Sequence, residues 1–214
     1  MKKRRTLIIS LLLIASMALG LGYAAVTREL SIKGGAELAI TEDKFAVEFI
    51  NTESDKPVAT FSEDSAGTLT SWEANGNVAK FGLAGMEHEG ESVTILYKIQ
   101  NKTGDLYGKL NTVEAGVGLV YLGTGTSTPG NFDDYFTMSA KVYKADSTGA
   151  KGAEWTDSDI LNPTATETTD NSNIAYVEVT LALKTELSTR ITLSGATVSV
   201  TWDGLNSVEL AALS

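Results

Sequence analysis

The chain has no cysteine, a single histidine and only three prolines among its 214 residues. Without cysteine it forms no disulfide bond, and it offers no thiol nucleophile and no cysteine ligand for zinc. With only His88, a hydrolase site built on two helical histidines is nearly excluded. No G-x-S-x-G motif is present to supply a serine nucleophile. The core alone must therefore hold the fold, and the chain is long enough for one.

Long apolar runs are scarce as well, and the one clear example lies at the N-terminus. Four basic residues precede residues 6–21, which are almost wholly apolar but shorter than the roughly 20 residues that a spanning helix needs. Small residues follow in "GYAA". This layout is typical of a secretory signal peptide over residues 1–24. We expect cleavage after Ala24, with Ala25 as the neighbouring candidate; an uncleaved N-terminal anchor is the alternative.

Positive charge is also in short supply. The net charge is −10, and loss of residues 1–24 would remove four positive charges and no negative one, which gives −14. Nucleic acid would repel a chain of this charge, so we expect no nucleic-acid partner. An acidic exported domain is suited to solubility and to cation binding.

What the chain does have is apolar alternation with a period of two. This pattern, in segments rich in Val, Ile, Thr and Tyr, is typical of half-buried strands. The alternating sets are Val93, Ile95, Tyr97 and Ile99; Phe136, Met138, Ala140 and Val142; Val177, Val179, Leu181 and Leu183; and Ala196, Val198, Val200 and Trp202. Turn signals such as "EANGN", "NKTGD" and "GTGTSTPGN" separate the strands. The sequence predicts an all-β antiparallel sandwich over residues 34–214.

Three segments carry more local expectations. "GVGLVYLG" is a continuous apolar run, which is consistent with a strand covered on both faces. "AEWTDSDILNP" is expected to hold one short helix that is capped by Thr156 or Asp157. "GLNSVELAALS" is consistent either with a last strand or with a terminal helical turn.

Metal and ligand signals are weak. The "MEHEGE" segment around His88 is expected to be a solvated charged turn, and we expect no metal site and no cofactor. The acidic pairs Asp133–Asp134 and Asp157–Asp159 could bind calcium, but neither fits the twelve-residue calcium loop, so surface acidity explains them. Among the tryptophans, Trp202 is in phase with a strand's apolar face and is expected in the core. Trp72 and Trp155 stay open as exposed candidates for carbohydrate binding.

The segment after the cleavage site has a strand-like pattern of its own. In "AVTRELSIK", residues 25–33, the side chains of Val26, Leu30 and Ile32 share one face with Arg28 between them. A free strand of this kind has an apolar face and unpaired backbone groups, which addition to a sheet edge would satisfy. Gly34 and Gly35 offer a pivot. The alternative is that residues 25–33 form the first strand of their own domain.

Several segments in this order resemble the TasA/camelysin family, matrix-fibre proteins of Gram-positive bacteria that a SipW-type signal peptidase processes. The segments are "GLGYAA", "GGAELAI", "LAGMEHEGESVTILYKIQNKTGDLYGKLNTVEAG", "FTMSAKVYKAD", "YVEVTLALKT" and "ATVSVTWDGL". The resemblance covers most of the mature chain, except for residues 144–173.

The resemblance implies a jelly-roll sandwich that assembles by donor-strand exchange. The N-terminal arm of one subunit then fills a groove in the next. Carried to this sequence, the donor-strand arm is residues 25–33, with Val26, Arg28, Leu30 and Ile32 as its assembly residues. The expected function is that of a secreted, non-enzymatic subunit of a biofilm-matrix fibre, with itself and the peptidase as partners and the membrane contacted only by the precursor. The alternatives are a monomeric cell-surface adhesin and, because camelysin is described as a metalloprotease, a secreted protease.

Overall fold

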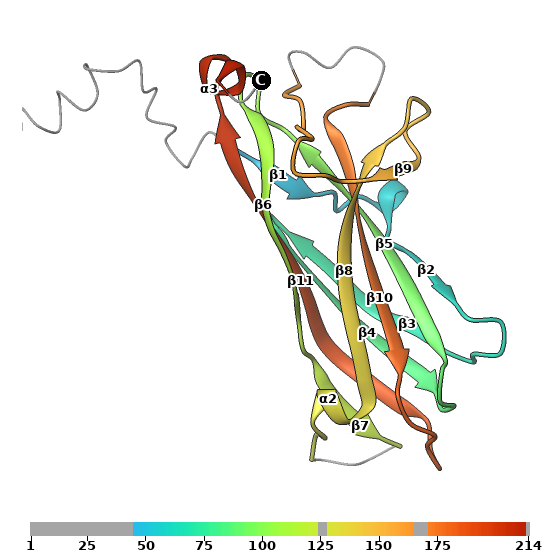
Figure 1. Cartoon of the computed structure of the whole chain (residues 1–214). Helices are drawn as coiled ribbons and strands as arrows, with labels where there is room; N and C mark the ends of the chain where they lie inside the picture. The colour runs from blue at the N-terminus through green and yellow to red at the C-terminus, as the bar shows by residue number, and fades with distance from the viewer. Residues whose placement is uncertain (1–44, 124–127, 165–170, 213–214) are drawn as a thin grey trace, which may run out of the picture. The chain divides into compact units, whose positions relative to one another are not determined.

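The computed structural model describes residues 45–123, 128–164 and 171–212. The signal segment, the expected cleavage site and the arm at residues 25–33 lie outside the described residues. Within the described part, two antiparallel sheets account for nearly all of the regular structure, so the predicted all-β sandwich is confirmed (Figure 1). No helix in this part is both long and apolar enough to cross a bilayer.

Sheet A has six strands in the order β1-β5-β10-β8-β9, with β2 beside β1 on the same edge of β5. Its strands are β1 (Val47–Phe49), β2 (Val58–Phe61), β5 (Ser92–Asn101), β8 (Phe136–Ala145), β9 (Lys151–Glu154) and β10 (Ile174–Leu183). The central strands β5, β10 and β8 are each ten residues long and pair over most of their length. Their alternation of buried apolar and more exposed side chains favours this register, because a slip of one residue would turn the buried apolar side chains to solvent.

Sheet B has five strands in the order β3-β4-β11-β6, and β7 continues the line of β6 along β11. Its strands are β3 (Thr68–Asn75), β4 (Val78–Met86), β6 (Tyr107–Gly116), β7 (Leu119–Leu122) and β11 (Ile191–Leu205). β3 and β4 are joined by a two-residue turn in which Gly76 has φ 56°, the left-handed region that glycine enters without strain.

Three short helical segments complete the described part: η2 (Glu53–Asp55), α2 (Phe132–Tyr135) and α3 (Ser207–Ala211). α3 lies at one end of the strands, whereas α2 and β7 lie at the other (Figure 1). "GLNSVELAALS" forms both of the structures expected for it, because β11 runs to Leu205 and α3 follows. Asn206 caps α3, since its side chain accepts hydrogen bonds from the backbone N–H groups of Val208 and Glu209.

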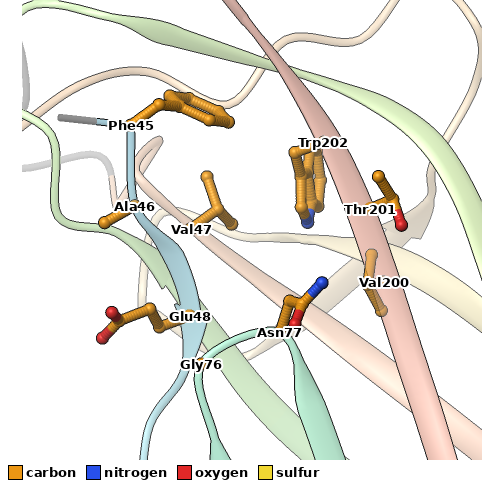
Figure 2. Close-up of a pocket in the computed structure, with 9 residues that line it drawn as sticks. All are labelled: Phe45, Ala46, Val47, Glu48, Gly76, Asn77, Val200, Thr201 and Trp202. Carbon is orange, nitrogen blue, oxygen red and sulfur yellow. The ribbon is translucent and has the colours of Figure 1, made fainter. Parts of the chain in front are cut away.

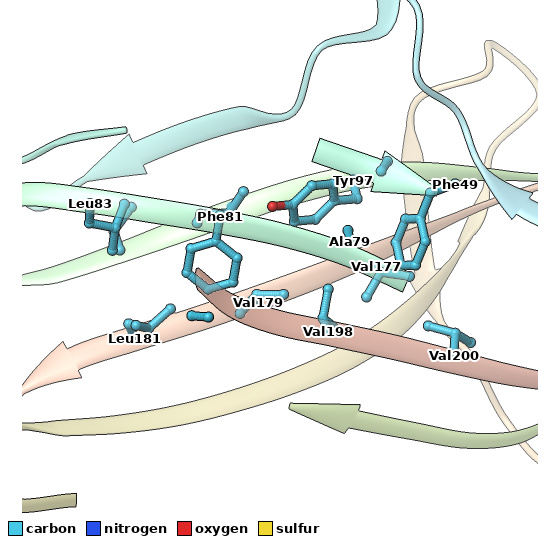
Figure 3. Close-up of a cluster of buried hydrophobic side chains, with 14 of the residues drawn as sticks. Phe49, Ala79, Phe81, Leu83, Tyr97, Val177, Val179, Leu181, Val198 and Val200 are labelled. Atoms are coloured by element: carbon cyan, nitrogen blue, oxygen red, sulfur yellow. The ribbon is translucent and has the colours of Figure 1, made fainter. Parts of the chain in front are cut away.

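The core lies between the inner faces of the two sheets (Figure 3). The alternating sets predicted from the sequence supply most of it, and Tyr97 packs edge-on against Phe49 with 5.6 Å between ring centroids. Trp202 is 9% exposed, which confirms its predicted place in the core.

Two local expectations are wrong. Residues 155–163 form no helix: the Thr156 hydroxyl and backbone N–H both donate to the Asp159 carboxylate, which closes a turn, and Leu161 then enters the core in an extended segment. "GVGLVYLG" is not covered on both faces by the described residues. Only Val120 of β7 is buried, whereas Val117 is 63% exposed and Leu119 is 53% exposed.

Candidate functional site

The inner faces of β6 and β8 are less well covered than those of their neighbours. Met138 and Ala140 of β8 are half-buried, whereas Leu181 and Val179, their register partners on β10, are fully buried. The same holds in sheet B. Val113 is half-buried and Ala115 is exposed, although their partners on β11, Val200 and Val198, are buried. We call this gap between β6 and β8 the open seam. Its apolar side chains face water that an additional strand would exclude.

The backbone at the open seam is also incompletely paired. Among the described residues, no strand pairs with the outer edge of β6 over residues 109–116 or with that of β8 over residues 136–141. The Val142 carbonyl accepts a hydrogen bond from Trp155 on this edge, and backbone direction alternates along a strand. The N–H and C=O groups of Met138 and Ala140 therefore point to the same edge, which has the character of a template for strand addition.

One end of the open seam is closed by residues 155–164, which we call the strap. The strap leaves the edge of β8 at Trp155 and crosses to the edge of β6, where Leu161 and Gly108 exchange two backbone hydrogen bonds of 2.8 Å. Leu161 is 0% exposed, and Trp155 packs edge-on against Trp202 with 5.2 Å between ring centroids. Trp155 is thus half-buried against the core, which removes it as an exposed carbohydrate platform.

A buried amide anchors the strap. Asn101, which is 0% exposed, donates from Nδ2 to the carbonyls of Leu106 and Leu161 and accepts from the Thr103 backbone N–H. The Thr164 N–H and hydroxyl both donate to the Thr103 carbonyl. The strap is therefore held by buried and partly buried hydrogen bonds, and loss of a buried one would lower stability.

The opposite end of the open seam widens into a cavity of about 380 Å³ beside α2. Its lining residues are Ala115, Val117, Phe132, Asp133, Phe136, Thr137, Met138 and Lys184. The Lys184 ammonium donates to the backbone carbonyl of Asp133, and no described residue pairs with the Asp133 carboxylate. A cavity that is lined by apolar side chains together with Asp133 can accept an apolar stem that ends in a cation.

Other hollows are also present in the described part. A cavity of about 260 Å³ lies where Phe45 begins the described chain, and Trp202 and Asn77 line it between β1 and β11 (Figure 2). A hollow of about 840 Å³ lies beside α3 and is lined by Tyr107, Ile160 and Leu210, among others.

The charged turn around His88 is only partly solvated. His88 Nδ1 lies 2.7 Å from Glu186 Oε1, and the hydrogen bond to this carboxylate raises the pKa of the exposed His88 above its usual value. Glu91, expected to be solvated, is 6% exposed because its carboxylate accepts from the Glu87 backbone N–H at 2.7 Å. Among the described residues, no group of three or more His, Cys, Asp or Glu side chains is placed to hold a metal ion.

The predicted site residues Ala24, Ala25, Val26, Arg28, Leu30 and Ile32 all lie outside the described residues. The sequence reasoning did not predict the open seam. Two weak signals for it were present: Ala115 and Ala140 are small residues at inward-facing positions, and the apolar run around Val117 has no polar alternation.

No protein-family model matches the sequence, and no curated protein matches it. Among solved structures, the chain is similar to the enzymatically active domain of tailspike protein 4 from bacteriophage CBA120, at 13% identity with a TM-score of 0.23. That alignment covers 74% of this chain and 19% of the tailspike chain, so this chain spans about a fifth of that protein's length. A TM-score of this size establishes no shared fold, and nothing about function follows from it.

Proposed function

We propose that this protein is a secreted structural subunit of an extracellular fibre of the biofilm-matrix type, in which an N-terminal strand of one subunit fills the open seam of the next. The observation that carries the proposal is the open seam itself, with unpaired backbone on β6 and β8 and half-covered apolar side chains between them. Addition of a strand would pair the free backbone groups and cover the apolar side chains in one step.

The arm has the dimensions that the open seam requires. The unpaired edge of β6 spans residues 109–116, which at about 3.4 Å per residue is roughly 27 Å long. Residues 25–32 are also eight residues long, and three of the four side chains on one face of this segment are aliphatic. Removal of the signal segment by a SipW-type peptidase would free this strand, and processing would thereby permit assembly.

Electron microscopy of the secreted chain tests the proposal, and regular filaments are the expected result. Deletion of residues 25–32 should leave folded monomers that no longer polymerise. Unfolding of the truncated chain would show instead that the arm belongs to its own domain. A folded, monodisperse secreted protein that forms no filaments would favour an adhesin.

A variant within the open seam separates blocked assembly from general damage. Ala140→Asp places a carboxylate on the half-buried inner face of β8, whereas Ser139→Asp places the same group on the exposed outer face one residue away. We expect Ala140→Asp to abolish filaments and Ser139→Asp to retain them. Thermal unfolding should show that both monomers remain folded.

A further inference from the structure

We infer that the incoming arm pairs antiparallel with β6 in one fixed register, with Arg28 seated in the cavity beside α2 and facing Asp133. This inference rests on the proposed function and adds to it the edge, the direction and the residue that sets the alignment.

The pairing of the strap with β6 gives the direction. Leu161 of the strap pairs with Gly108 in antiparallel fashion, and it is the strap that ends the free edge of β6. An arm that continues the line of this bridge would also run antiparallel to β6, the arrangement with the more favourable ladder. The arm would then approach the strap with its C-terminal end, and the Gly34–Gly35 pivot would lie where the strap crosses.

The inward-facing positions of β6 give the register. A bulge in the pairing of β6 with β11 leaves Asn111 without a partner, so the inner face presents Leu110, Val113 and Ala115 in turn. Beyond them lies Val117, which lines the cavity and is 63% exposed. These are four positions for the four side chains on the inner face of the arm. Counted from the strap, the pairs are Ile32 with Leu110, Leu30 with Val113, Arg28 with Ala115, and Val26 with Val117.

This alignment explains the charged residue within the apolar face. Arg28 falls opposite Ala115, the smallest of the four side chains and one that lines the cavity of about 380 Å³. The aliphatic stem of Arg28 can pack against Phe132 and Phe136, which line the cavity, while its guanidinium group pairs with the Asp133 carboxylate. Lys184 also lines the cavity, but its ammonium is bound to the Asp133 carbonyl and leaves the carboxylate available. A shift by one inward position toward the strap would place Arg28 against Val113, which does not line the cavity, and a shift in the other direction would leave Leu110 uncovered.

Cysteine cross-linking tests the register directly, because the chain has no native cysteine. Two double variants of the secreted chain are compared: Leu30→Cys with Val113→Cys, the predicted pair, and Leu30→Cys with Ala115→Cys, one rung away. Directly opposed Cβ atoms lie about 4.5–5.5 Å apart and diagonal ones about 7–8 Å. After mild oxidation, the first variant should give a ladder of covalent oligomers on a non-reducing gel and the second should give far less.

Charge reversal tests the seat of Arg28. Asp133→Arg should raise the concentration needed for filament formation by about tenfold or more, since like charges across an interface are strongly disfavoured. Asp134→Arg makes the same change one residue away, at a side chain that does not line the cavity, and should have little effect. The double variant Arg28→Asp with Asp133→Arg should recover assembly.

The outcomes separate the two proposals. If filaments form but the cross-link appears in the shifted pair, the register is wrong and the fibre proposal stands. The same holds if filaments form and Asp133→Arg and Asp134→Arg have equal effects. Absence of filaments from the unsubstituted secreted chain would overturn the fibre proposal. A disulfide that forms within a monomer would show that the arm fills the seam of its own subunit, which overturns both.

Discussion

The two long flanks of the sandwich are closed in different ways. On the flank of β1, β2 and β3, the chain links its own sheets: the Phe49 N–H donates to Gly76, and Asn51 Nδ2 donates to the Ala74 carbonyl. The connection from β2 to β3 packs so tightly that a Cβ on Gly67 would lie 2.4 Å from the Phe61 ring. On the flank of β6 and β8, the described chain crosses between the sheets at the strap and at α2, and no described strand pairs with the stretch between them.

This difference separates a part of the molecule that supplies stability from the part to which we assign the proposed function. The central strands satisfy their backbone and side chains within one chain, and the flank of β1, β2 and β3 is linked across the two sheets by the contacts of Phe49 and Asn51. The open seam leaves the same kinds of groups unsatisfied in one continuous stretch. Solvent-facing strand edges are normally protected by charge, proline or bulges; β6 has one bulge, at Asn111, and the half-covered apolar side chains beyond it are what favour strand addition in our proposal.

The largest effect on stability should come from a buried residue of β10 rather than from its register partner on β8 at the open seam. Leu181→Ala removes a fully buried side chain and should lower the free energy of unfolding by about 3 kcal/mol. Met138→Ala, its half-buried register partner at the open seam, should cost only about 1 kcal/mol. Urea denaturation of the monomer measures both. Equal losses would mean that the seam is as well packed as the core.

The second largest effect on stability is expected at Asn101, which anchors the strap. Asn101→Ala leaves the buried carbonyls of Leu106 and Leu161 without their side-chain donor and should cost about 2 kcal/mol. Asn111→Ala removes an exposed amide that donates to Asp203 and should cost less than about 0.5 kcal/mol. If the two variants unfold at the same denaturant concentration, the strap is not held in the way described.

At Tyr97, which lies in the core between the two sheets, we expect a smaller change in the free energy of unfolding, and in the stabilising direction. Its hydroxyl is buried and has no hydrogen-bond partner among the described residues, and burial raises its pKa. Tyr97→Phe removes this unsatisfied group and should leave stability unchanged or raise it by about 1 kcal/mol. A clear loss of stability would reveal a partner for the hydroxyl, such as a buried water.

The smallest effect concerns pH at the exposed pair of His88 and Glu186. The carboxylate raises the pKa of His88, so its contribution is present below pH 6.5 and is lost as pH rises through the folded value. His88 and the Glu89 N–H lower the pKa of Glu186, so its contribution is lost as pH falls below 4.5. Unfolding midpoints should be slightly higher at pH 5.5 than at pH 8, and His88→Gln should remove the difference. An unchanged pH dependence in that variant would exclude this pair as its cause.

The sequence was sufficient for the fold but not for the open seam. β5 and β10 alternate strictly, and both the strands and their buried faces followed from that pattern. Whether Val113 or Ala140 is covered depends on which strands lie beside β6 and β8, and that is set by pairings between distant segments. The strap was mispredicted for the same reason. Its Thr156 and Asp157 are both residue types that cap helices, and burial of Leu161 in the core decides against the helix.

Residue-resolved hydrogen exchange at Val113 and Ala115 of β6 tests the central claim most directly. The Val200 N–H donates to the Asn77 carbonyl, away from β6, so the backbone groups of its register partner Val113, and those of Ala115, point to the free edge. The account predicts that both amides exchange rapidly in the monomer and become strongly protected in the filament, while Val198 and Val200 of β11 are protected in both states. Strong protection of Val113 and Ala115 in the monomer would contradict the account, because it would mean that the edge of β6 is already paired within one chain.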